Sequence, residues 1–175
     1  MKALKLGFTA LVLILSMLLS VAANAQEIDS VGSFQTAELT PQLEKEIKCL
    51  AQNIYYEAGS EPYNGKVAVA QVTMNRVESG RFASTVCGVV KQKTFWQGST
   101  VCQFSWFCTP KAKLRIPDSI NYQESLMVAQ RVLLEGFGLQ HLQEALYFHA
   151  THVNPNWGKV KVAKIGNHIF YRDHK

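Results

Sequence analysis

The stretch from Asn53 to Arg76 reads NIYYEAGSEPYNGKVAVAQVTMNR, and it decides how the chain folds. Thr40-Pro41 begins a predicted helix upstream of it, because Thr is a favoured N-cap and Pro fits the first helical position. Apolar residues recur at helical spacing from Ile47 to Ala58, and Gly59 ends this helix. A second helix is predicted from near Pro62 to about Val77. The alternation in VAVAQV is also seen in strands, but the length of the segment favours a helix.

The remainder of the chain predicts less regular structure followed by strands. Residues 80–117 are rich in Gly, Ser, Thr, Cys and aromatic residues, and we expect mostly loop. A third helix is predicted over 119–135, capped by Asp118 or Ser119. ALYFHA (145–150) and KVAKI (161–165) are strand candidates, and GNH is a turn signal before IFYR. The predicted fold class is α+β, a single domain with helices first and a small C-terminal antiparallel β-sheet.

The first 25 residues have the pattern of a secretory signal peptide. Lys2 and Lys5 form a basic start, Leu11–Leu19 is an apolar core, and Ala23-Asn24-Ala25 is a cleavage signal. The apolar run is short for a membrane anchor. We therefore predict a flexible lead-in over 26–40 and one domain over 41–175. The expected protein is exported, to the periplasm or the medium, with no stable membrane anchor after cleavage.

Charge and cysteine content narrow the class of partner. Loss of Lys2 and Lys5 with the leader lowers the net charge from +5 to +3. This mild excess suits an anionic polymer such as a cell wall, and there is no basic cluster interleaved with aromatics that would indicate nucleic acid. Export and the even number of cysteines favour disulfides, and four cysteines allow three pairings. The sequence contains no CxxC motif, so it does not indicate a zinc knuckle, and we expect no metal or cofactor.

Glu57 is the candidate catalytic residue. On a helical wheel it falls about 20° from Leu50, at the edge of the apolar stripe and near the helix C-terminus. Partial burial and the helix dipole both raise a carboxyl pKa there, which is what a general acid needs near neutral pH. The alternative is a surface carboxylate, or one that pairs with Arg76 or Lys66.

Other residues are candidates for substrate binding. Glu61 stands directly before Pro62, where capping of the second helix is the favoured role and catalysis the alternative. Sugar rings stack on aromatic faces and bond through hydroxyl and acetamide groups, although aromatic residues are more often part of the core. The remaining candidates flank Glu57, lie in CQFSWFC or alternate along a predicted strand: Tyr55, Tyr56, Gln103, Phe104, Ser105, Trp106, Tyr147 and His149. Asn167 and His168 are assigned to a hairpin turn.

Four segments together resemble the SleB/CwlJ cell-wall hydrolase family: residues 49–77, CQFSW, ALYFHA and IGNHIFYR. The resemblance covers roughly residues 48–172. The family pattern Ile-Tyr-x-Glu-Ala-Arg-Gly-Glu-Pro is matched except at Gly59 and Ser60, where the family has Arg-Gly. Members resemble lysozyme-like glycosidases and cleave the glycan strands of peptidoglycan, and the best-studied are lytic transglycosylases of spore germination. The resemblance implies that Glu57 is the catalytic acid.

The resemblance implies a lytic transglycosylase that acts between N-acetylmuramic acid and N-acetylglucosamine, with Glu57 alone as acid and base. Hydrolysis is the alternative if a second carboxylate orients a water. Three other classes stay open. A zinc amidase or peptidase would use His149, His152 and His168, and a thiol peptidase would use Cys102 with His149. A non-catalytic wall-binding module would leave Glu57 unexplained. Protein partners are not predicted.

Overall fold

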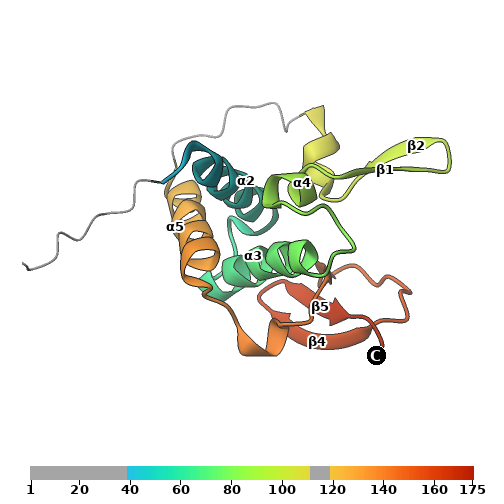
Figure 1. Ribbon diagram of the computed structural model, residues 1–175. Helices are drawn as coiled ribbons and strands as arrows, with labels where there is room; N and C mark the ends of the chain where they lie inside the picture. Colours follow the sequence, from blue (N-terminus) through green and yellow to red (C-terminus); the bar gives the residue numbers. More distant parts are fainter. Residues whose placement is uncertain (1–38, 111–118) are drawn as a thin grey trace, which may run out of the picture. The chain divides into compact units, whose positions relative to one another are not determined.

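The computed structural model describes residues 39–110 and 119–175 (Figure 1). Helix α2 (Pro41–Ala58) begins where the sequence predicts, and Thr40 Oγ1 accepts a hydrogen bond from the Leu43 N–H at 3.2 Å. Gly59 follows the last helical residue. The predicted signal peptide, residues 26–38 of the lead-in and the alternative cap Asp118 lie outside the described residues.

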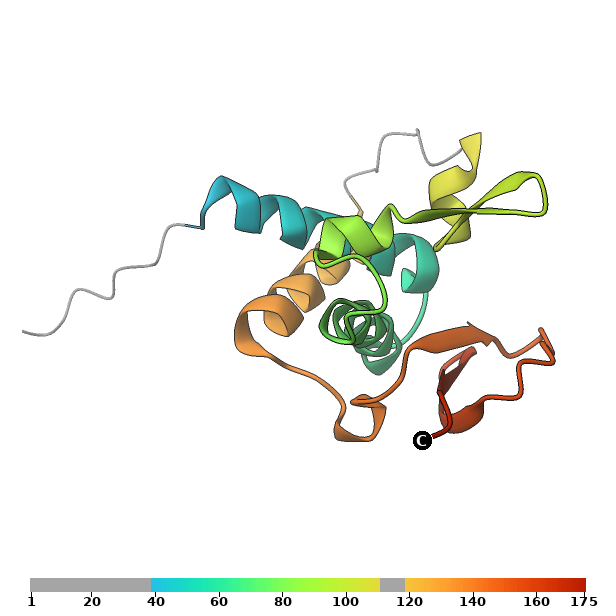
Figure 2. The ribbon, with the colours of Figure 1, turned by 45° about the vertical axis from the view of Figure 1, so that its right-hand side comes forward.

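Helix α3 (Tyr63–Glu78) lies at the centre of the domain. Figure 2 shows it nearly end-on, between helices α2 and α5 (Ile120–Glu135) and the C-terminal strands. The four consecutive residues from Val67 to Ala70 are fully buried, which requires neighbours on every side of the helix. This enclosure explains why VAVAQV has no clear helical period, and the predicted helix is confirmed.

Helix α5 and the C-terminal sheet also confirm the predicted class. Ser119 caps α5 by accepting from the Tyr122 N–H at 3.3 Å, and Gly136 ends it with φ +65°. A 3-10 turn (Gln140–Leu142) leads into a three-stranded antiparallel sheet of order β3-β5-β4. The strands are β3 (Tyr147–Ala150), β4 (Val160–Ile165) and β5 (His168–Arg172). The α+β fold, with helices first and strands last, is therefore as predicted.

The prediction of mostly loop over residues 80–117 is wrong for the described part, residues 80–110, and residues 111–117 lie outside the described ranges. This region contains helix α4 (Val86–Val90), strands β1 (Lys93–Trp96) and β2 (Ser99–Cys102), and the 3-10 turn η2 (Ser105–Cys108). Gln97 and Gly98 join the two strands with φ of +47° and +78°. Two-residue hairpin turns need positive φ, but they usually begin with Asn, Asp or Gly, so Gln97 concealed the hairpin.

The four cysteines form two disulfides, Cys49–Cys87 and Cys102–Cys108. The first joins α2 to α4, and the second joins the end of β2 to the end of η2. This is one of the three pairings that the sequence allowed. Within the described ranges, no helix combines the length and the apolar character needed to cross a membrane.

Candidate active site

Glu57 lies in a pocket of about 310 Å³ that is built from both halves of the chain. The last turns of α2 and α3 form one part of its lining, and the segment after β2, strand β3 and Trp157 form the rest. Among the described residues that line it, Glu57 is the only carboxylate. The lining residues are Glu57, Arg76, Cys102, Gln103, Phe104, Ser105, Tyr147, Phe148 and Trp157.

The Glu57 carboxyl has the properties of a general acid. It is partly buried, and within the described part of the chain it makes no hydrogen bond or ion pair. Burial raises its pKa from 4.5 to about 7, and the positive charge of Arg76 opposes this shift. Lys66, the other suggested partner, pairs with Glu124 instead. A carboxyl with a pKa of about 7 keeps a protonated fraction near neutral pH, which is the condition that a general acid needs.

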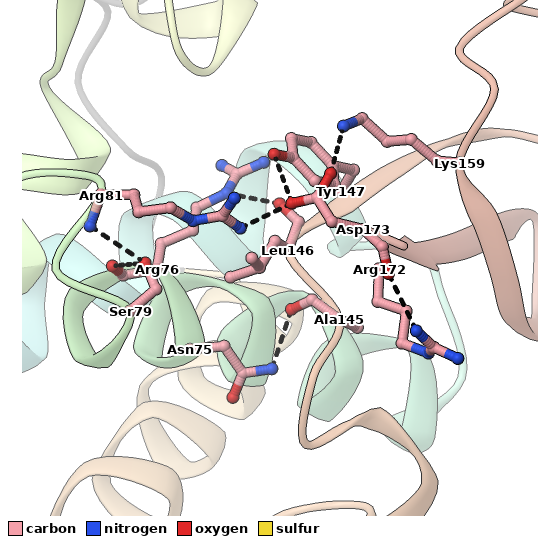
Figure 3. A network of polar contacts seen from close by, with 10 residues as sticks. All are labelled: Asn75, Arg76, Ser79, Arg81, Ala145, Leu146, Tyr147, Lys159, Arg172 and Asp173. Carbon is pink, nitrogen blue, oxygen red and sulfur yellow. Dashed lines mark hydrogen bonds and ion pairs between the residues drawn. The ribbon is translucent and has the colours of Figure 1, made fainter. Parts of the chain in front are cut away.

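Arg76 is a pocket residue that the sequence suggested only as a possible ion-pair partner. Its side chain is 4% exposed, and its Nε donates to the Leu146 carbonyl at 2.8 Å (Figure 3). The guanidinium carbon lies 5.2 Å from the centre of the Phe82 ring and 5.0 Å from that of Phe104. No local pattern singles it out, because helix α3 also carries Lys66, Asn75 and Glu78.

Tyr147 lines the pocket from β3, as its position on the strand suggested, and a charged network holds its ring. Its hydroxyl donates to Asp173 at 3.2 Å, and Asp173 also pairs with Arg81 and Lys159 at 2.7 Å each (Figure 3). The hydrogen bonds from Lys159 and then Arg81 lower the pKa of Asp173 to about 2. The Lys159 ammonium stands 3.6 Å from the centre of the Tyr147 ring.

The CQFSW segment divides between the pocket and the core. Gln103 and Ser105 line the pocket beside Phe104, which is only 3% exposed and also belongs to the core. Trp106 does not line it. The Trp106 ring stacks on Tyr56 at 4.5 Å, and its Nε1 donates to Asn53 at 2.9 Å.

The two tyrosines beside Glu57 also lie outside the pocket lining. Tyr55 contacts the rings of Tyr56 and Tyr122 edge-on, at 5.2 and 5.9 Å between ring centres. Both were candidates for substrate binding, and in this structure both belong to an aromatic cluster with Trp106 and Tyr122. Trp157, from the same loop region as His152, takes part in the lining instead.

His149 is next to the pocket and not in its lining. Its Nε2 is 2.8 Å from the Tyr171 hydroxyl, and its ring lies 5.4 Å from Trp157. Burial lowers the pKa of His168.

Within the described ranges, no three His, Cys, Asp or Glu side chains are grouped so that they could hold a metal ion. Cys102 is bonded to Cys108 and has no thiol, which overturns the thiol-peptidase alternative.

Glu61 does not cap α3, and the capping prediction is wrong. The N-cap position of α3 is Pro62, which has no side-chain hydrogen bond to the helix. Glu61 is 8% exposed, and its two oxygens accept from Asn167, from the backbone N–H at 2.8 Å and from Nδ2 at 3.0 Å. The carboxylate thus binds the turn between β4 and β5, a partner 106 residues away that no local pattern could indicate. It lies outside the lining of the Glu57 pocket.

Comparison with solved structures and curated proteins relates this fold to known enzymes. The catalytic domains of SleB from Bacillus cereus and of the germination-specific lytic transglycosylase SleB from Bacillus anthracis superpose with TM-scores of 0.54 and 0.55. They are 27% and 26% identical in sequence, and each match covers 74% of this chain and 91% or 95% of the domain. The spore cortex-lytic enzyme of Bacillus subtilis is 32% identical over 156 residues, 85% of this chain and 43% of that protein.

A second curated relative and the family model agree with this likeness. The spore cortex-lytic enzyme of Oceanobacillus iheyensis is 30% identical over 134 residues, 73% of this chain and 41% of that protein. The chain thus spans less than half the length of these curated relatives. The model of the cell wall hydrolase family matches residues 60–171, a range that begins just after Glu57. With most of the described residues inside that match, the chain belongs to the cell wall hydrolase family.

Proposed function

We propose that this protein cleaves the glycan strands of peptidoglycan as a lytic transglycosylase, with Glu57 as the single acid and base. The observation that carries the proposal is the Glu57 carboxyl, which has a pKa of about 7 and is the only carboxylate among the described residues that line its pocket. The names of its relatives support the substrate, because they are a germination-specific lytic transglycosylase and spore cortex-lytic enzymes.

The reaction needs one group that first gives and then takes a proton. Protonated Glu57 donates to the glycosidic oxygen between N-acetylmuramic acid and N-acetylglucosamine as the bond to the muramic C1 breaks. The Glu57 carboxylate then accepts the proton of the muramic C6 hydroxyl, whose oxygen bonds to C1. The products are a free N-acetylglucosamine hydroxyl and a 1,6-anhydromuramic end, and Glu57 is protonated again. No water is consumed.

The pocket composition favours this outcome over hydrolysis. Two-carboxylate glycosidases place the second acid about 5 to 9.5 Å from the first. Glu61 was the nearest candidate in sequence, but both of its oxygens bind Asn167. The other pocket side chains suit sugar binding: Gln103 and Ser105 offer hydrogen bonds, and Tyr147 and Trp157 offer rings.

We also propose that the protein acts outside the cytoplasm. The predicted signal peptide over residues 1–25, the mild positive charge and the two disulfides agree with export. A protein that acts on the wall polymer must meet it there.

Mass spectrometry of the products tests the reaction. Purified peptidoglycan is incubated with the wild type, with Glu57→Gln and with the control Glu135→Gln, which changes an exposed glutamate paired only with Arg131. The wild type and the control should release 1,6-anhydromuramyl fragments, and Glu57→Gln should release less than about one hundredth as much. Reducing-end sugars would mean hydrolysis. Cleaved peptides on intact glycan, or an active Glu57→Gln variant, would reject the proposal.

A further inference from the structure

Arg76 differs from the other arginines in the described residues. Arg81, Arg131 and Arg172 each form an ion pair with a carboxylate, namely Asp173, Glu135 and Glu144. No carboxylate oxygen lies within ion-pair distance of Arg76 among the described side chains, although Arg76 is the most deeply buried of the four. A buried charge without a paired anion does not favour folding, so its presence calls for another explanation.

The Arg76 guanidinium is fixed on three sides. Its Nε is bonded to the Leu146 carbonyl, and its faces lie against Phe82 and Phe104. Its Nη1 is buried and has no hydrogen-bond partner. One N–H donor group is thus held in place, shielded from solvent and unused.

The charged and titratable groups that act on Arg76 come from two neighbouring elements. Glu57 from α2 and Tyr147 from β3 both favour its charged form, while burial lowers its pKa to about 10. Arg76 therefore stays charged at neutral pH. The other described residues that line the pocket carry no charge.

We propose that Arg76 is a positioning residue for the acid: its unused Nη1–H donates to the Glu57 carboxylate once that group has given up its proton. This inference rests on the proposed function. Glu57 makes no hydrogen bond or ion pair with Arg76 in the structure, and the negative charge that Arg76 attracts is complete only after proton transfer. The interaction therefore strengthens as the reaction advances, which is the condition for it to accelerate the step. When the C6 hydroxyl returns a proton to Glu57, the interaction is released.

Nuclear magnetic resonance tests the coupling in the intact protein, without altering Arg76. The Glu57 carboxyl carbon and the Arg76 side-chain nitrogens are followed from pH 4 to pH 9 in the wild type. We expect both to titrate with one midpoint near 7, and we expect the Arg76 signals of Glu57→Gln to stay constant over that range. Arg76 signals that do not respond, or that respond equally in Glu57→Gln, would overturn the proposal.

The pH profile of kcat/KM tests the functional consequence. Activity falls at high pH because Glu57 ionises. Removal of the positive charge of Arg76 raises the pKa of Glu57, so Glu57 ionises at a higher pH. Arg76→Gln should move this limb upward by about 1 pH unit and lower kcat at pH 6 by about tenfold or more, whereas Arg76→Lys keeps the charge and should stay near the wild-type limb. An unshifted limb in Arg76→Gln would contradict the proposal.

The control is Arg131→Gln, which removes an arginine that also lies over a phenylalanine, Phe137, at 4.2 Å but is remote from the pocket. It should leave the limb unchanged. If Arg76→Gln lacks a cooperative thermal transition, the resonance titration alone decides. Coupled titration in a protein that releases no glycan fragments would retain this inference and reject the proposed function. Glycan cleavage without coupled titration would retain the proposed function and reject this inference.

Discussion

Glu57 occupies a position that favours chemistry over stability. Its pKa is about 7 in the folded protein against 4.5 for an ordinary glutamate, so folding disfavours the ionised form. The contribution of the protonated Glu57 side chain to the free energy of unfolding is complete below pH 4.5 and is lost as the pH rises through 7. The function proposed for the site and this loss of stability have the same cause, which is burial without a partner.

Glu57→Gln should therefore stabilise the protein in a pH-dependent way. Gln resembles the neutral acid, so we expect a gain of about 2 to 3 kcal/mol in the free energy of unfolding at pH 8 and little change at pH 4.5. Urea unfolding at both pH values measures it, with Glu135→Gln as the exposed control. An equal effect at both pH values would show that the Glu57 carboxyl titrates normally.

Glu61 is the opposite case, a carboxylate with both oxygens engaged. Glu61→Gln replaces one acceptor by an NH₂ group that faces the donors of Asn167, and we expect it to destabilise the fold by about 2 kcal/mol. Activity per folded molecule should be retained, because Glu61 lies outside the pocket lining. Thermal unfolding and glycan release separate the two effects. A variant of normal stability with lost activity would place Glu61 in the reaction instead.

The β4–β5 turn shows how closely the elements are fitted to one another. Gly166 has φ +55°, and a Cβ added to it would lie 1.9 Å from Glu61 Oε2. Gly158 has nearly the same φ, +57°, but has open space around its Cα. Gly158→Ala should cost about 1 kcal/mol for the left-handed backbone, and Gly166→Ala should cost at least about 2 kcal/mol more because Glu61 must move. Equal losses of stability would mean that the turn is not fixed against Glu61.

The elements themselves could be predicted where local signals were strong. Thr40, Ser119 and Gly136 mark helix ends, and GNH is a turn signal between two strand candidates, so these boundaries were close to those observed. The β1–β2 hairpin was missed because Gln97 is an unusual residue in such a turn and because the short strands are exposed on both faces. Local patterns therefore identified the three long helices and the C-terminal strands, and they missed both the exposed hairpin and the short helix α4, whose valines belong to the core.

The pocket could be predicted only in part, because its members come together through tertiary contacts. Glu57 has a local signature, an acidic residue at the edge of an apolar stripe. Arg76 has no such signature, since its role depends on Phe82, Phe104 and Leu146 from three other segments. Trp106 carried a plausible sugar-binding signal, yet its ring is stacked on Tyr56 outside the pocket lining.

The two disulfides should contribute differently to the whole molecule. Cys49–Cys87 closes 38 residues and Cys102–Cys108 closes 6. From loop-closure entropy, replacing the first pair by alanine should cost about 4 kcal/mol and the second about 2 kcal/mol. Denaturant unfolding of the two double variants compares them. Replacing the second pair should lower glycan release more than its small loss of stability would suggest, because Cys102 lines the pocket. The expectation would be contradicted if replacing the second pair cost more stability than replacing the first and lowered glycan release less.

The Cys102–Cys108 bond also determines when the rim of the pocket is complete. A newly made chain in a reducing cytosol carries two thiols at this point, and the rim of its pocket is not yet joined to the end of η2. Under the export proposed above, oxidation completes the rim only after the chain reaches an oxidising compartment. A cell that makes a wall-cutting enzyme would in this way delay its full competence until the enzyme and its polymer share one side of the membrane.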